Sequence, residues 1–275
     1  MNKSNGGTRG WLWFTIPIII FLAIATTGGI FVDDLYRDYP SFVAQAIGQD
    51  IVSLVIVLPI LAISAFLARR GSPGAYLIWF GGLIYLVYTY VIAAFDVNFN
   101  MLFLVYVAVL GCSLYALIGG LVTTNMASIK ECFTGRTPIR AISIYLMVLA
   151  IVFYFLWLRE IIPALLTNQI PQSIQDNGTP TNGVQVLDMA WILPAFVIAA
   201  IHLWRKQAFG YVLAGALLTY SVFLILAILS MVVTMVRNGH PVALPQAIIF
   251  GTLLTLSMGM LIWYMGGLKS RSSVV

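Results

Sequence analysis

Charged residues and cysteines are both scarce in this chain. Of its 275 residues only 8% are charged, 61% are hydrophobic, and the mean hydropathy is +1.00. A soluble globular domain carries about 25% charged residues, so this composition excludes one. The two cysteines, Cys112 and Cys132, do not form a disulfide framework and are expected to be free thiols.

Several catalytic signatures are also missing. The chain has no His-Glu-x-x-His metalloprotease motif, no Gly-x-Ser-x-Gly motif, no Walker motif and no dinucleotide-binding glycine fingerprint. A retinal protein needs a lysine inside its last helices, whereas Lys269 lies at the end of the last apolar stretch. These absences argue against an enzyme, indicate no metal site and leave any cofactor unknown.

What the chain has instead is long apolar runs. A helix needs about 20 mostly apolar residues to cross the hydrocarbon layer of a membrane. Eight stretches qualify: 11–32, 51–69, 75–95, 101–123, 141–163, 187–204, 209–235 and 245–267. Because the runs are continuous and do not alternate with polar residues, they predict an all-α polytopic membrane bundle rather than a β-barrel. The lipid bilayer is then the main partner.

The charges predict the orientation of these spans. An even number of spans places both termini on one side. The cations expected on that side are Lys3, Arg9, Arg69, Arg70, Lys130, Arg136, Arg140, Arg205, Lys206, Lys269 and Arg271. The opposite side receives three, Arg37, Arg159 and Arg237, and every acid except Glu131. Cations in short loops mark the cytoplasm, so the sequence predicts a plasma (inner) membrane protein with cytoplasmic termini. The net charge of +5 then indicates topology and not nucleic-acid binding.

The chain also resembles itself at an offset of 135 residues. Between 58–87 and 193–222, nine of 30 ungapped positions are identical. The matches include Pro59 with Pro194, Arg70 with Arg205, and Tyr85 with Tyr220. We therefore expect two four-helix halves, 1–135 and 136–275, related by an axis along the membrane normal. Chance similarity between apolar helices is the alternative.

The paired prolines are expected to kink the second and sixth helices. Kinked helices related by symmetry often flank a central cavity. Membrane helices also tolerate proline without any such role.

Two segments carry a resemblance to known proteins. One is Asp-Val-Asn-Phe-Asn-Met-Leu-Phe-Leu-Val-Tyr-Val at 96–107; the other is Leu-Pro at 193–194 with Leu-Trp-Arg-Lys-Gln-Ala-Phe-Gly-Tyr at 203–211. Together they resemble a group of multi-pass prokaryotic integral membrane proteins with no established activity. The resemblance covers most of both halves and implies a membrane bundle without indicating a function.

Two acids lie near the outer ends of the second and sixth spans. Counting back about 20 residues from Arg205 places Asp188 roughly one turn inside the outer boundary. An ionised carboxylate there needs a partner or water. Asp50 occupies a related position, displaced by about one helical turn, so we expect both acids to face the same axis. They are candidates for a cation or proton pathway, with capping of the helix N-termini as the alternative.

Four more residues are candidates for the same pathway. Arg159 and Glu160 interrupt an apolar run, and Arg159 needs an acid such as Asp188, Asp50 or Glu160. A salt bridge between the halves and a substrate clamp both fit this pair. Tyr85 and Tyr220 lie deep in their spans, where a hydroxyl needs a partner, so they line a polar cavity or serve as packing aromatics.

These features favour a protein that moves a small solute or ion along a pathway between the halves, opening outward near Asp50 and Asp188. A non-catalytic sensor, assembly factor or subunit of a larger complex fits the short loops equally well. Such a component would work as a homo-oligomer or with a membrane partner subunit. An enzyme that acts on lipid is a third alternative, and it lacks a recognisable nucleophile or metal set.

Overall fold

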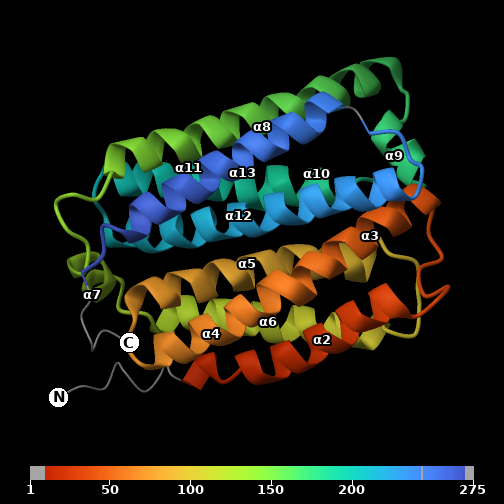
Figure 1. Cartoon of the computed structure of the whole chain (residues 1–275). Coiled ribbons are helices and arrows are strands. Elements are labelled where there is room, and N and C mark those ends of the chain that lie inside the picture. Colours follow the sequence, from red (N-terminus) through yellow and green to blue (C-terminus); the bar gives the residue numbers. More distant parts are fainter. Residues whose placement is uncertain (1–9, 243, 270–275) are drawn as a thin grey trace.

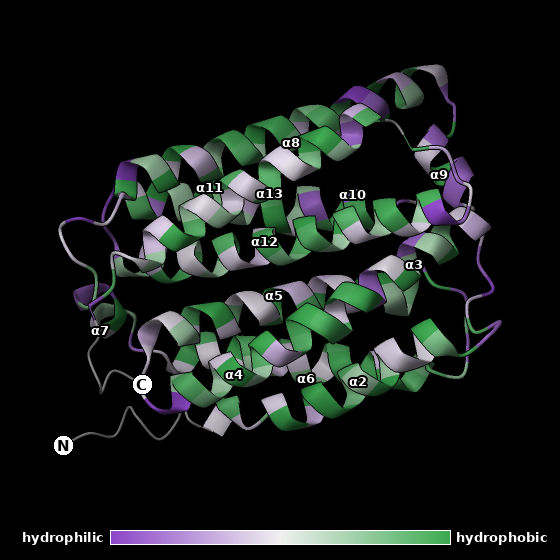
Figure 2. Ribbon diagram, viewed as in Figure 1, coloured by the Kyte–Doolittle hydropathy of each residue, from purple (hydrophilic) through white to green (hydrophobic). Residues whose placement is uncertain are grey.

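The computed structural model describes residues 10–242 and 244–269, which form a bundle of long helices (Figure 1). Eight helices in this part of the chain are long and apolar enough to cross a membrane. The described residues contain no strand, only an isolated bridge between Phe133 and Leu268. The predicted all-α polytopic bundle is therefore confirmed. Hydrophobic residues cover the long helices, while hydrophilic ones gather at both ends (Figure 2).

The eight spans are built from twelve elements, and two short helices lie in the connections. The spans are α2 (Thr15–Phe31), α3 (Pro40–Val52) with η1 (Ser53–Val57) and α4 (Leu58–Arg69), α5 (Pro73–Phe95), α6 (Phe103–Thr123), α8 (Ile139–Thr167), α10 (Gly183–Leu187) with η2 (Asp188–Ile192) and α11 (Leu193–Trp204), α12 (Ala208–Arg237) and α13 (Leu244–Met265). The connecting helices are α7 (Met126–Glu131) and α9 (Gln172–Asn177).

The second span begins eleven residues before the predicted start, at Pro40 and not at 51. Pro40 suits the first helical turn, where its missing N–H costs nothing. The early turns contain Gln45, Gln49 and Asp50, so hydropathy alone does not identify them. They are helical because they pack on α12, where the Thr234 hydroxyl donates to the Ala44 carbonyl over 2.7 Å.

The second and sixth spans each contain a five-residue π-helical segment directly before a Leu-Pro pair. Proline cannot donate a backbone hydrogen bond and crowds the carbonyl four residues earlier. A wider π turn accommodates that disturbance inside a helix. Pro59 and Pro194 therefore mark local changes of helical pitch, and Asp188 is the first residue of the second π segment.

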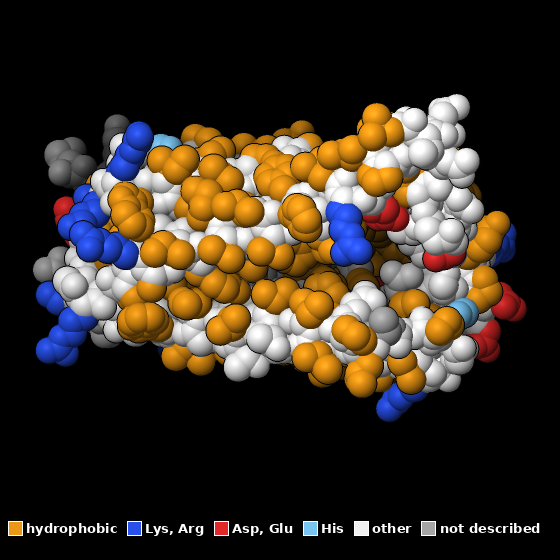
Figure 3. All heavy atoms as spheres, turned by 90° about the horizontal axis from the view of Figure 1, so that it is seen from above, with side chains coloured by type: hydrophobic (Ala, Val, Ile, Leu, Met, Phe, Trp, Pro, Cys, Tyr) orange, Lys and Arg blue, Asp and Glu red, His pale blue; other side chains and the backbone are white. Residues whose placement is uncertain are grey.

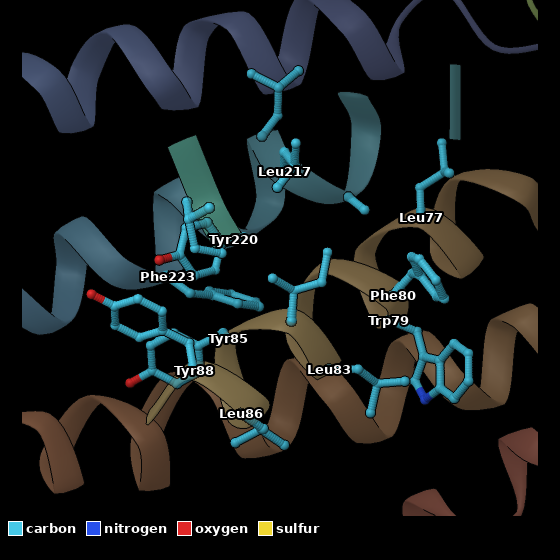
Figure 4. Packing of buried hydrophobic residues seen from close by; sticks show 14 of the residues in the cluster. Leu77, Trp79, Phe80, Leu83, Tyr85, Leu86, Tyr88, Leu217, Tyr220 and Phe223 are labelled. Atoms are coloured by element: carbon cyan, nitrogen blue, oxygen red, sulfur yellow. The ribbon is translucent and has the colours of Figure 1, made fainter. Parts of the chain in front are cut away.

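The first four spans and the last four, which we call the first and second halves, meet along α5 and α12, the two most buried spans. Their aromatic side chains interlock there (Figure 4). The rings of Tyr85 and Phe223 lie 6.0 Å apart, and those of Tyr88 and Tyr220 lie 5.6 Å apart, both edge to face. Towards the other end, the Gly81 backbone rests directly against Ala216. We call this tightly packed contact between α5 and α12 the seam.

The charged side chains divide between the two ends of the bundle. One end carries most of the cations and includes α7, and the other carries most of the acids and includes α9 (Figures 1 and 3). The first described residue, Gly10, and the last, Lys269, both belong to the cation-rich end, where Lys269 N–H donates to the Cys132 carbonyl. Lys3, Arg9 and Arg271 lie outside the described residues.

Candidate functional site

A cavity of about 340 Å³ lies between the two halves at the acid-rich end. Helices α3 and α5 of the first half form one side, and α8, α10, α12 and α13 of the second half form the other. The connection that contains α9 reaches its mouth through Ser173, Asn177 and Thr179. The walls are mostly apolar, with polar groups at separate points, as is usual for small-molecule sites.

Asp188 lies on the floor of this cavity and is only 5% exposed. Its carboxylate accepts a 3.0 Å hydrogen bond from the Tyr88 hydroxyl and a 2.9 Å bond from Trp157 Nε1. Both donors are neutral, so they compensate part of the burial cost without cancelling a negative charge. The cavity contains a second acid, Asp96, and no Lys, Arg or His among the residues that line it in the described part of the chain. Its electrostatics therefore favour a cation.

Helix capping does not explain either buried acid. The helix that leads to Asp188 begins at Gly183, and the Asn182 side chain caps it by accepting from Gln185 N–H over 3.1 Å. The helix that contains Asp50 begins at Pro40. Both acids therefore lie inside helices, and the capping alternative for them is wrong.

Asp50 and Asp188 occupy different surroundings. Tyr36, in the connection between α2 and α3, donates a 2.6 Å hydrogen bond to Asp50, which also lies against Gly29. Burial and the nearby Asp50 carboxylate raise the pKa of Tyr36, so its hydroxyl keeps its proton. The cavity is lined by Gln45 and Gln49 of the same helix, and Asp50 is not among its residues. The structure thus places Asp50 within the first half and Asp188 between the halves.

Glu160 ties down the connection that covers the mouth of the cavity. It accepts a 2.8 Å hydrogen bond from Gln185 Nε2 and a 3.2 Å bond from Ser173 N–H. On the opposite side, Asp96 accepts a 3.0 Å bond from Gly183 N–H. Burial raises the pKa of Asp96, and this hydrogen bond partly opposes the shift. Glu160 and Asp96 therefore hold both flanks of the α9–α10 segment over the site.

Arg159 is exposed and lines a separate opening between α8 and α13. The three acids expected as its partners accept hydrogen bonds from other groups: Asp188 from Tyr88 and Trp157, Asp50 from Tyr36, and Glu160 from Ser173 and Gln185. No ion pair joins the two halves through Arg159 among these contacts.

Tyr85 and Tyr220 are almost fully buried, at 0% and 1% exposed, and both belong to the seam. The Tyr85 hydroxyl lies 2.9 Å from the Ser53 hydroxyl. Tyr220 and Asp188 both line a small hollow of about 30 Å³ beside the main cavity. Of the two tyrosines, Tyr220 thus lines the same hollow as Asp188, while Tyr85 packs on Phe223 and contacts the Ser53 hydroxyl.

Sequence reasoning did not connect Asp188 with the residues that complete this site. Trp157 and Tyr88 supply the two hydrogen bonds to Asp188, and the amides Gln45, Gln49 and Gln246 provide polar groups on the walls. The signal for Trp157 was its place two residues before Arg159 in an apolar run. No spacing in the sequence relates it to Asp188, which lies 31 residues later.

The described residues contain no group of three or more His, Cys, Asp or Glu side chains that could hold a metal ion. The cavity holds one buried carboxylate, Asp188, which is hydrogen-bonded to Tyr88 and Trp157. Comparison of the chain with protein-family models, with curated proteins and with solved structures finds no match.

Proposed function

We propose that this integral membrane protein takes up a small cationic solute from the outer side and moves it across the membrane. The observation that carries the proposal is the buried carboxylate of Asp188 at the floor of a cavity between two helical halves. Ionisable residues at such depth are costly in a membrane and typically mark a pathway for ions or substrates. The aromatic rings of Tyr88 and Trp157 beside the carboxylate add a surface that attracts ammonium groups.

An internal duplication supports a pathway between the halves. The π segments Ser53–Val57 and Asp188–Ile192 begin and end 135 residues apart, as do α4 and α11. At the same offset Tyr85 corresponds to Tyr220 and Tyr88 to Phe223. The ring pair Tyr85–Phe223 of the seam therefore corresponds to the other ring pair, Tyr220–Tyr88. Such a pattern is expected of parallel repeats related by an axis along the membrane normal. We propose that residues 1–135 and 136–275 are these repeats.

The seam and the π segments indicate how the pathway closes at the acid-rich end and opens at the cation-rich end. Between Asp188 and the cation-rich end, Leu77, Gly81 and Tyr85 of α5 pack against α12 and close the passage. Opening that side requires the halves to separate along the seam while the mouth near α9 closes. The π segments beside Pro59 and Pro194 are the points where the second and sixth spans can bend.

The cation-rich end faces the cytoplasm in this proposal, since cations in short loops mark that side. We expect Thr181→Cys, in the connection before α10, to react with a membrane-impermeant maleimide on intact cells. Gln207→Cys, between α11 and α12, is expected to react only after permeabilisation. Both residues are exposed, and the background carries Ser at Cys112 and Cys132. Labelling of both cysteines from the same side would contradict the topology.

A non-catalytic sensor or complex subunit is the second candidate function. The observation that favours it is the seam itself, since its buried aromatic packing leaves no passage to the cation-rich end in this conformation. A sensor would bind the same cation in the cavity and transmit the occupancy to a partner without opening the seam.

Tetramethylammonium is a suitable probe for both candidates because its charge is permanent and membranes exclude it. A transporter in proteoliposomes is expected to bind tetramethylammonium and to accumulate radiolabelled probe in a saturable manner, and Asp188→Asn weakens both. Binding without uptake, in vesicles whose protein is shown to be folded, favours the sensor. Absence of millimolar binding in lipid nanodiscs would remove the proposed site.

A further inference from the structure

A second space lies beside the cavity, on the outer surface of the bundle. A space of about 760 Å³ separates α8 from α13 near the acid-rich end, which we call the window. Figure 3 shows a hollow on this face, with a basic and an acidic side chain at its rim. Phe153, Leu156, Trp157, Gln246 and Phe250 line both the window and the cavity, so the two spaces adjoin each other along these side chains. Only side chains of α8 and α13 thus stand between the cavity and this outer surface.

In the described part of the first half, the corresponding helices lie against each other. There α2 packs closely on α6, with the Trp11 ring against Gly119 and the Leu102 side chain against Gly28. In the second half α8 packs instead on α11, and α13 is the least buried span, with 11% of its residues buried against 33% for α6. The window is therefore a departure from the repeat, located where the acid of the cavity is found.

The cavity and the window differ in the chemistry of the residues that line them. The inner cavity offers two acids and several amides, next to the rings of Tyr88 and Trp157. Apart from Arg159, Glu160 and Gln246, the residues that line the window are apolar, and they include Val152, Ile249 and Leu253. A ligand that fills both spaces needs a cationic polar head and an apolar chain.

We propose that the ligand is an amphiphile with an ammonium head and a hydrocarbon chain, and that it enters sideways from the outer leaflet. The head lies beside Asp188, where a negative carboxylate and aromatic rings favour an ammonium group. The chain leaves through the window between α8 and α13. This inference rests on the proposed function, because it names the substrate class of the same site.

The test compares tetramethylammonium with dodecyltrimethylammonium, which shares its head group and adds a chain. The full-length protein is placed in nanodiscs of phosphatidylglycerol, a lipid without an ammonium group. The double variant Val152→Trp/Ile249→Trp fills the window. The matched control, Ile151→Trp/Ile248→Trp, adds the same bulk one position away, at residues that are 60% exposed and do not line either space.

We expect the window-filling variant to weaken dodecyltrimethylammonium binding at least 10-fold and to leave tetramethylammonium binding within 2-fold. The control variant should match the unmodified protein for both probes. Thermal unfolding checks that both variants are folded. If the window-filling double variant fails to fold, the single variant Ile249→Trp replaces it, and Ile248→Trp is then the matched control.

Two results would overturn the inference and leave the proposed function intact. In the first result, the unmodified protein binds both probes, and the window-filling variant binds dodecyltrimethylammonium with unchanged affinity. The ligand would then enter through the mouth. In the second result, the unmodified protein and the control variant are dimers, the window-filling variant is a monomer, and the binding of both probes is unchanged. The window would then be an interface between two copies of the chain. Failure of both probes to bind the unmodified protein would instead remove the Asp188 site itself.

Discussion

Asp188→Asn is expected to raise the Kd for tetramethylammonium by roughly 10- to 100-fold, equivalent to about 1.4–2.8 kcal/mol. The physical reason is the loss of a unit charge in partly buried surroundings, where a cation a few ångströms away gains energy of this order. The measurement is a binding isotherm in lipid nanodiscs. Asp50→Asn is the matched control, because that acid pairs with Tyr36 and does not line the cavity.

The same substitution is expected to lower the free energy of unfolding by about 1–3 kcal/mol. Asp188 accepts from both Tyr88 and Trp157. An asparagine oxygen can keep the Trp157 donor, but its Nδ2 group then faces the Tyr88 hydroxyl, which must accept and loses the acceptor for its own proton. Adding Tyr88→Phe removes one donor and should recover part of this loss. Unchanged affinity in Asp188→Asn, in a protein shown to be folded, would contradict the site; unchanged stability would contradict the hydrogen-bond pattern.

Gly81→Leu is expected to cost about 1–3 kcal/mol or more of stability, because it overpacks the contact between the halves. A Cβ at Gly81 would meet the Ala216 carbonyl and lie 2.5 Å from Thr219 Cβ. Backbone and a short β-branched side chain cannot move aside without separating α5 from α12. Denaturation in mixed micelles, followed by circular dichroism, measures the effect.

Gly111→Leu provides the control for this prediction. Gly111 lies within α6, and a Cβ there would have nothing within 4 Å. Leucine is the better helix former by most of a kcal/mol, so this variant should equal or exceed the unmodified protein in stability. Equal losses in the two variants would mean that α5 and α12 are not tightly packed at Gly81.

The sequence by itself determined the membrane fold. Twenty-residue apolar runs permit only helices that satisfy their own backbone hydrogen bonds in lipid, so the number of spans follows from hydropathy. The approximate helix ends also follow from hydropathy, except at residues 40–50. Polar side chains there lower the hydropathy, and the helix depends on its contact with α12. The paired positions of Pro59 and Pro194 predicted the disturbed helices, though not their π-helical form.

Only the tertiary structure decided which acid lies in the cavity. At the offset of 135 residues Asp50 corresponds to Gln185, and Asp188 corresponds to Ser53, whose hydroxyl lies beside Tyr85. The rotation of each helix about its axis then turns Asp50 towards Tyr36 and Asp188 towards Trp157. Helix rotation depends on side-chain packing between elements far apart in the chain, and hydropathy carries no information about it.

The window between α8 and α13 was likewise decided by packing alone. α8 is more apolar and α13 less apolar than α2 and α6, which lie against each other in the first half, so hydropathy does not predict which pair is in contact. In lipid the hydrophobic effect does not distinguish a helix that faces another helix from one that faces acyl chains. Close van der Waals fit makes that choice, and it brings Trp11 onto Gly119 in one half while leaving α8 apart from α13 in the other.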